Sequence, residues 1–306
     1  MRNFRDYAVL TLKGLGMGAA DIIPGVSGGT IAFITGIYEE LINSIRSVNL
    51  KALKLLFTFR FNGFWEHVNG TFLLSVVTGI FISIFSLSRL IEYLLITYPI
   101  FIWSFFFGLI LASSVVILRG IRGWNYALVI ALISGILLAY LITSVTPGET
   151  PEAYWFVFLS GAIAICAMIL PGISGSFILL LLGKYQYILN AVNELSFDIL
   201  LVFVAGAAVG IIAFSNFLGW LLKHAHNITV VLLAGFMLGS LNKIWPWKEI
   251  VSTFTDRHGD INPLVVKNVL PCVSNPSDGF IPAVLFAILG ITVIILIEFL
   301  SYKHKK

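Results

Sequence analysis

A short motif containing proline and glycine occurs twice in this chain, and each copy lies inside a long apolar stretch. The first copy, residues 24–29, reads Pro-Gly-Val-Ser-Gly-Gly, and the second, residues 171–176, reads Pro-Gly-Ile-Ser-Gly-Ser. The similarity continues at the same offset of 147 residues through the pairs Ile31 and Ile178, Gly36 and Gly183, Tyr38 and Tyr185, and Asn43 and Asn190. Interruption of two apolar segments at matching positions in two halves of a chain predicts the binding site of a membrane transporter.

The overall composition also indicates a membrane protein. Of the 306 residues, 58% are hydrophobic and 11% are charged, whereas a soluble domain carries about 25% charged residues. The two cysteines, Cys166 and Cys272, are far apart and match no disulfide framework or metal-binding spacing. We therefore expect an all-α integral membrane protein with no cofactor, no bound metal and no nucleic-acid partner.

Six apolar segments can each supply the roughly 20 residues that a helix needs to cross a bilayer. The expected helices cover residues 70–95, 97–118, 124–146, 198–222, 225–243 and 279–301. The two motif segments, at about residues 10–43 and 153–193, are too long for a single span and are interrupted at their centres by the motif. We interpret each as a re-entrant helical hairpin, because broken backbone at membrane depth is tolerated where it is buried in protein or lines a wet cavity.

A second similarity indicates that most of the chain is duplicated. The similar segments, at an offset of 127 residues, are 71–95 with 198–222 and 108–113 with 235–240. We therefore interpret residues 1–150 and 151–306 as two repeats, each with one hairpin and three spans, the second carrying an outer loop at 244–278. Because three is an odd number of crossings, the second repeat would enter the membrane in the opposite orientation, which gives an inverted-topology repeat.

The distribution of basic residues predicts that both termini lie in the cytoplasm. With that orientation the short inner connections contain Arg and Lys, whereas the outer connection 143–154 contains only Glu149 and Glu152 as charged residues. This pattern follows the positive-inside rule. The long outer connection, counted here from residue 243 to 278, is mixed in charge, and its basic residues are Lys243, Lys248, Arg257 and Lys267.

The motif and its flanking residues resemble a known family. Residues 16–30 read Gly-Met-Gly-Ala-Ala-Asp-Ile-Ile-Pro-Gly-Val-Ser-Gly-Gly-Thr, and Gly-Ile-Tyr-Glu follows at 36–39. Together with Leu-Pro-Gly-Ile-Ser-Gly-Ser at 170–176 and Gly-Lys-Tyr at 183–185, this pattern is similar to bacterial polyprenyl-phosphate translocases of the PopT type, over roughly residues 8–300. The resemblance implies that undecaprenyl phosphate moves from the outer to the inner leaflet of the cytoplasmic (inner) membrane, where this lipid carrier is recycled for envelope polymer synthesis.

The chemistry of the motif suits a phosphate group. Glycine permits a close approach of the backbone to a ligand, and a helix that restarts after Ser27 or Ser174 would direct free N–H groups toward an anion. The candidate substrate-binding residues of the two motifs are Pro24, Gly25, Ser27, Gly28, Gly29, Thr30, Pro171, Gly172, Ser174, Gly175 and Ser176. The alternative is that both motifs are tight turns whose small residues serve helix packing.

Four charged residues are further candidates, and each has a simpler structural explanation. Asp21 lies at a depth where ionisable groups are costly, so we expect it to couple transport to an ion, with capping of the turn as the alternative. Glu39 is a second coupling candidate or an interfacial charge. Arg89 suits bidentate contact with phosphate oxygens, although a salt bridge with Glu92 would also explain it. Lys184 either meets a phosphate in the outer leaflet or extends to the interface.

These features predict a transporter rather than an enzyme. Its expected partners are a polyprenyl-phosphate lipid and the bilayer, with H⁺ or Na⁺ as candidate coupling ions. Two alternatives stay open, namely a secondary transporter of a small anion, which would need an aqueous vestibule, and a membrane enzyme that acts on lipid phosphates. The enzyme lacks support in the sequence, since no His-Glu-x-x-His motif and no cluster of carboxylates is present.

Overall fold

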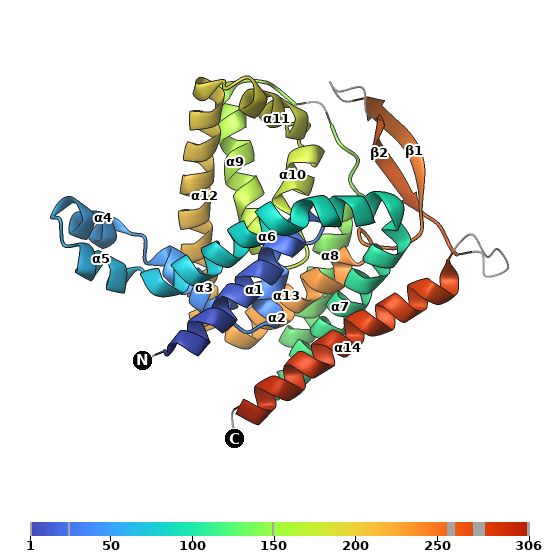
Figure 1. Ribbon diagram of the computed structural model, residues 1–306, viewed down its shortest axis with the longest axis horizontal. Helices are drawn as coiled ribbons and strands as arrows, with labels where there is room; N and C mark the ends of the chain where they lie inside the picture. The colour runs from blue at the N-terminus through green and yellow to red at the C-terminus, as the bar shows by residue number, and fades with distance from the viewer. Residues whose placement is uncertain (1, 24, 149, 256–260, 272–278, 305–306) are drawn as a thin grey trace.

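The computed structural model describes residues 2–23, 25–148, 150–255, 261–271 and 279–304 (Figure 1). The helices before residue 150 are α1 (Phe4–Ile22), α2 (Gly28–Ile34), α3 (Tyr38–Arg46), α4 (Leu50–Phe57), α5 (Phe61–His67), α6 (Gly70–Thr97), α7 (Pro99–Gly120) and α8 (Tyr126–Ser144). The elements after it are α9 (Tyr154–Ile169), α10 (Gly175–Leu181), α11 (Tyr185–Asn193), α12 (Phe197–His224), α13 (His226–Ser240), β1 (Lys248–Thr255), β2 (Ile261–Asn268) and α14 (Phe280–His304). The described chain is thus nearly all helical, as the sequence predicts.

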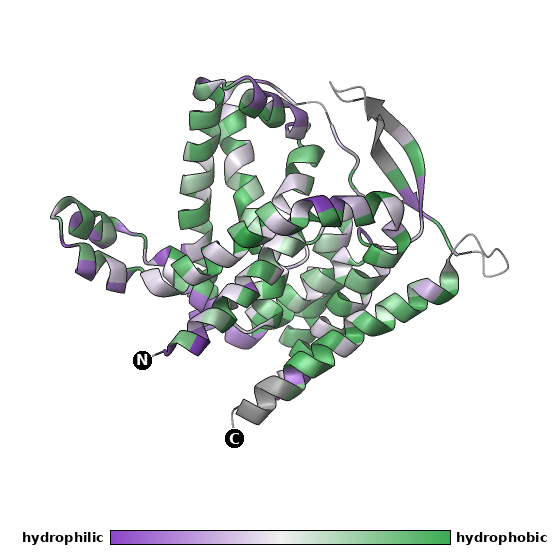
Figure 2. Ribbon diagram, in the orientation of Figure 1, coloured by the Kyte–Doolittle hydropathy of each residue, from purple (hydrophilic) through white to green (hydrophobic). Residues whose placement is uncertain are grey.

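Five helices of the described chain are long and apolar enough to cross a membrane, namely α6, α7, α8, α12 and α14. Large apolar side chains are exposed along them, for example Phe85 on α6 and Leu201 on α12, and Figure 2 shows hydrophobic residues over most of the length of α12 and α14. Because a soluble protein rarely exposes such continuous apolar surface, these faces identify a multi-pass membrane protein.

The sixth span expected from the sequence is shorter than predicted. Helix α13 has 15 residues, and at about 1.5 Å per residue it is some 8 Å short of a hydrocarbon core of about 30 Å. It begins at the polar pair His226 and Asn227 and ends at Ser240. The expected range 225–243 therefore includes flanking residues that are not helical.

Both motif segments form a long helix, a break, and a short helix that packs back against the long one. Helix α1 is followed by α2, and α9 is followed by α10, with packing within each pair. The restart is capped by a serine, since Ser27 Oγ accepts from the Gly29 N–H and Ser174 Oγ accepts from the Phe177 N–H. Two residues before the caps, Gly25 and Gly172 have φ angles of +88° and +93°, a region that residues with a side chain rarely adopt. Both breaks therefore depend on glycine.

The long helices pack in four main pairs, which are α1 with α6, α9 with α12, α8 with α13, and α7 with α14. Glycine allows the close approach in the first two pairs. A Cβ atom on Gly79 would collide with the carbonyl oxygen of Thr11, and one on Gly206 would collide with that of Phe158. Gly79 corresponds to Gly206 at the offset of 127 residues, and Thr11 corresponds to Phe158 at the offset of 147 residues. The same helix contact thus occurs at matching positions in both parts of the chain.

The expected outer loop at 244–278 contains a β-hairpin. Strands β1 and β2 are antiparallel, with Lys248 opposite Asn268 and Glu249 opposite Lys267. The expected outer loop therefore contains two strands, and β1 is rich in the β-branched residues that favour strands. Helices α4 and α5 also lie outside the helices expected from the sequence.

Candidate functional site

The two motif segments meet at their breaks in a contact that we call the tip junction, made by residues 25–30 and 168–176. Three hydrogen bonds cross it, from Ser27 Oγ to Met168 O (2.7 Å), from the Gly172 N–H to Thr30 Oγ1 (2.9 Å) and from the Gly25 N–H to Ser174 Oγ (3.2 Å). Ser27 and Thr30 are fully buried. The hydroxyl of Tyr38 on α3 donates a fourth bond to Ile169 O at 3.1 Å. The structure therefore brings together two segments that are far apart in the sequence.

The hydroxyl groups of the two capping serines are used inside the protein. Ser27 Oγ donates to Met168 O and accepts from the Gly29 N–H at 3.0 Å. Ser174 Oγ accepts from two backbone N–H groups and lies 3.3 Å from the hydroxyl of Ser176. In this conformation a phosphate could take these groups only if the tip junction opened.

The other motif residues make the junction compact. Pro24 lies outside the described residues, and Pro171 is buried. A Cβ atom on Gly29 would lie 2.5 Å from Ile169 O, and one on Gly175 would lie 2.6 Å from the Met168 side chain. Glycine at position 29 therefore lets the two breaks touch, and glycine at position 175 lets α10 fold back on α9.

Asp21 lies at the end of α1 and faces the start of α2. Its Oδ1 atom accepts a hydrogen bond from the Gly28 N–H at 2.6 Å. A Cβ atom on Gly28 would lie 2.5 Å from Asp21 Oδ2, so the contact leaves no room for a side chain there. The geometry shows the capping role, while the coupling role stays a prediction.

Glu39 lies away from the tip junction, on the exposed side of α3. Its Oε1 atom is 2.8 Å from Nε2 of His226, at the start of α13. Nearby, Nε of Arg46 donates to Oδ1 of Asn216 at 3.1 Å. These two contacts attach α3 to α12 and α13.

Arg89 and Lys184 also lie apart from the tip junction. Arg89 is exposed on α6, and no hydrogen bond or ion pair joins it to Glu92 or to any other residue that the structure describes. Lys184 is buried, and its ammonium donates to Thr150 O at 2.9 Å between the rings of Phe156 and Tyr187. Its charge is therefore directed toward the outer connection expected at 143–154.

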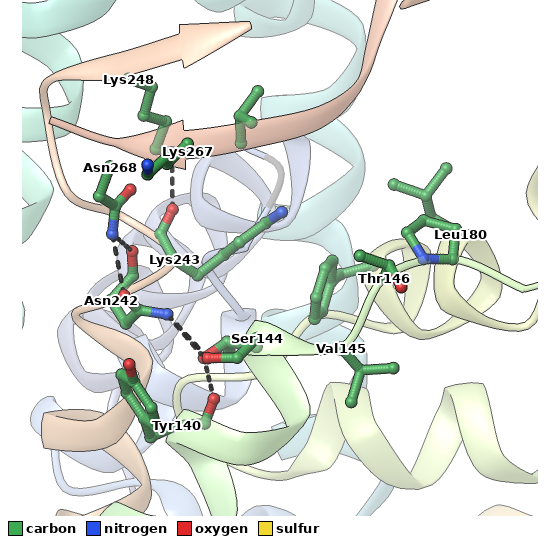
Figure 3. Close-up of a pocket in the computed structure, with 14 residues that line it drawn as sticks. Tyr140, Ser144, Val145, Thr146, Leu180, Asn242, Lys243, Lys248, Lys267 and Asn268 are labelled. Carbon is green, nitrogen blue, oxygen red and sulfur yellow. Dashed lines mark hydrogen bonds between the residues drawn. The ribbon is translucent and has the colours of Figure 1, made fainter. Parts of the chain in front are cut away.

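A cavity of about 310 Å³ adjoins the tip junction, and we call it the lysine cavity. Its walls come from the end of α8, from α10, from residues 242–243 and from the base of the β-hairpin (Figure 3). Lys243 and Lys248 line it, although in the sequence both stand out only as charges of the outer loop. The signal that could have identified them is their position, because basic residues in an outer loop depart from the positive-inside rule. Among the described residues no group of three His, Cys, Asp or Glu side chains could hold a metal ion.

Comparisons with known proteins agree with the resemblance noted in the sequence. A family model described as undecaprenyl phosphate translocase-like matches residues 17–262. A polyprenyl-phosphate transporter of Vibrio cholerae serotype O1 is 49% identical over 285 residues, which cover 92% of each chain. A polyprenyl-phosphate transporter of Staphylococcus aureus is 34% identical over 256 residues, 77% of this chain and 85% of the relative. No solved structure matches this chain.

Proposed function

Because this chain belongs to the undecaprenyl phosphate translocase-like family, we propose that it transports a polyprenyl phosphate, the lipid named in its relatives, across a membrane. The direction is from the outer to the inner leaflet of the bacterial cytoplasmic membrane, which returns the carrier lipid for envelope polymer synthesis. The observation that carries the proposal is the tip junction, in which two glycine-containing breaks in apolar helices touch through buried hydrogen bonds.

The molecule is an inverted-topology repeat of 1–150 and 151–306, with a re-entrant hairpin in each half. The matching glycine contacts of α1 with α6 and of α9 with α12 support the repeat. The pairing of α7 with α14 and of α8 with α13 supports it too, because exchange of the two halves converts one pair into the other. The packing of α10 back against α9 after the motif break supports the hairpin, and a further bend of 109° between α10 and α11 fits either a broken span or a re-entrant loop.

Transport proceeds by opening of the tip junction. The N–H groups of Gly25 and Gly172 and the hydroxyl of Ser27 donate across the junction in the closed state. When the hairpins separate, the same donors are free to bind phosphate oxygens, which are stronger acceptors because they are charged. The phosphate oxygens thus take the place of the acceptors in the closed state, which are Met168 O, Thr30 Oγ1 and Ser174 Oγ. The polar headgroup therefore keeps hydrogen bonds while it crosses the apolar layer.

A flip assay tests this function. The purified protein is reconstituted in liposomes that contain undecaprenyl phosphate, and the fraction of phosphate groups accessible from outside is followed with and without a pH gradient. We expect protein-dependent movement of the lipid phosphate between leaflets and none of the corresponding polyprenol. Uptake of inorganic phosphate or another small anion without lipid movement would instead favour the secondary anion transporter.

A further inference from the structure

The lysine cavity contains positive charges that no described acidic side chain in its walls neutralises. Lys243 follows α13 and Lys248 begins β1, and both side chains are largely withdrawn from solvent. No acidic residue of the described chain lines the cavity, and neither lysine forms an ion pair with a described residue. Buried ammonium groups without a counter-charge are costly. The site therefore has an electrostatic deficit that an anion would remove.

The contacts of the two lysines show that their charges are only partly stabilised. The Lys248 ammonium donates to the Lys243 carbonyl at 2.6 Å and lies 3.9 Å from the ring centroid of Trp103. The Lys243 ammonium lies 4.3 Å from the ring centroid of Phe177. Burial, together with repulsion from Lys243, lowers the pKa of Lys248 to about 7. Aromatic rings stabilise a cation weakly compared with a charged oxygen.

Lys267 is a poorer candidate, although it also borders the cavity. It is exposed, and it stands opposite Glu249 in the β-ladder. Residues directly opposite in an antiparallel pair have their side chains on the same face of the sheet, so the charge of Lys267 has a nearby carboxylate. The uncompensated charges are those of Lys243 and Lys248.

Two residues that line the cavity, Lys243 and Phe177, lie next to the two halves of the tip junction. A Cβ atom on Gly25 would lie 2.9 Å from Cγ of Lys243, so the lysine stem runs directly over the first break. Phe177, which lines the cavity, follows Ser176 of the second motif and donates its N–H to Ser174. An anion between the lysines would thus be positioned beside the donors that the tip junction releases when it opens.

We propose that the lysine cavity binds the phosphate headgroup of the transported lipid before the tip junction opens, with Lys243 and Lys248 as its cationic ligands. This inference rests on the proposed function. At about 310 Å³ the cavity is at the lower end of the range of small-molecule sites, which suits a headgroup and not an isoprenoid tail. Val145 and Leu180 give the cavity an apolar wall at the ends of α8 and α10, on which the first isoprene units next to the phosphate would pack (Figure 3).

Binding measurements on the purified full-length protein test the inference. The probes are a polyprenyl phosphate, the matching polyprenol and inorganic phosphate, and the variants are Lys243→Gln and Lys248→Gln, with Lys223→Gln on the exposed end of α12 as the matched control. We expect each cavity variant to bind polyprenyl phosphate about tenfold more weakly or worse, because a hydrogen bond to a charged group is lost, while the control binds as wild type. The polyprenol should not bind in the cavity.

The outcomes separate the two proposals. If wild type binds and transports polyprenyl phosphate and both cavity variants bind it equally well, the headgroup site is wrong and the proposed function stands. If wild type neither binds nor transports the lipid, the proposed function itself fails. Binding of inorganic phosphate that polyprenyl phosphate does not displace would make the cavity a site for the free anion and overturn the lipid assignment. The melting temperature of every variant is measured to show that it folds. If Lys243→Gln does not fold, the test rests on Lys248→Gln and on Lys243→Arg. Because Lys243→Arg keeps the positive charge, we expect it to keep binding polyprenyl phosphate.

Discussion

Ser27 is the residue whose hydroxyl connects the two motif segments most directly. The change Ser27→Ala removes its bonds to the Met168 carbonyl and to the Gly29 N–H in a fully buried place. Because a buried polar group left without a partner costs about 1–3 kcal/mol, we expect a clearly lower melting temperature in detergent. Ser86→Ala, on the exposed face of α6, is the matched control and should melt as wild type.

The same variants report whether Ser27 also serves the substrate. If its hydroxyl passes to a phosphate when the junction opens, Ser27→Ala should also weaken polyprenyl-phosphate binding by about tenfold. A lower melting temperature with unchanged affinity would show that Ser27 has only a structural role. The motif would then be a tight turn that serves helix packing, which is the alternative given for it above.

Asp21 combines a capping contact with an acidic group, and one substitution separates the two. Capping needs only an oxygen, which Asn would supply to the Gly28 N–H without burial of a charge. We therefore expect Asp21→Asn to fold with a near-native melting temperature and to lose gradient-driven transport in liposomes. Full gradient-driven activity would remove Asp21 from ion coupling and leave it as a cap, and Asp21→Ala should then be the destabilised variant.

At the scale of elements, helix α3 packs on α12 through buried residues such as Ile42, and exposed polar pairs add to this contact at its surface. The side chains of Glu39 and His226 are 56% and 51% exposed, and exposed pairs contribute about 0–1 kcal/mol. We expect Glu39→Gln to lower the melting temperature much less than Ser27→Ala. Asn216 on α12 accepts a hydrogen bond from Arg46, which lies on α3 together with Glu39. Glu39→Gln should therefore also increase the thiol labelling of a cysteine placed at position 216. Unchanged labelling would mean that α3 does not move away from α12.

The elements that the sequence predicts well are those whose signals are local. The five long apolar helices and the breaks at Gly25 and Gly172 follow from composition and from residues that only a turn requires. The β-hairpin was missed because its short strands lie in a segment with mixed charge. The hydrogen bonds of Ser27 and Ser174 could not be predicted, since their partners belong to the opposite motif segment. The lysine cavity is likewise assembled from residues between 140 and 268 that no single pattern connects.

At the scale of the whole molecule, the first described residues of α1 and the last of α14 lie toward the same side (Figure 1). The orientation expected from the basic residues, with both termini in the cytoplasm, is a separate prediction that accessibility labelling can test. In a background without Cys166 and Cys272, we expect Glu152→Cys to react with a membrane-impermeant thiol reagent added outside intact cells. Lys51→Cys, on exposed α4, should react only after permeabilisation, and reaction of Lys51→Cys in intact cells would reverse the orientation.

The pairing of α8 with α13 and of α7 with α14 has a consequence for how the chain is made. A ribosome that has finished the first 150 residues has delivered two long membrane helices whose principal neighbours have not yet been synthesised. Those helices must wait in the bilayer, in contact with lipid or an insertion factor, until α13 and α14 arrive. Neither half is therefore a complete folding unit, and two separately translated halves would have to find each other before either could acquire its native packing.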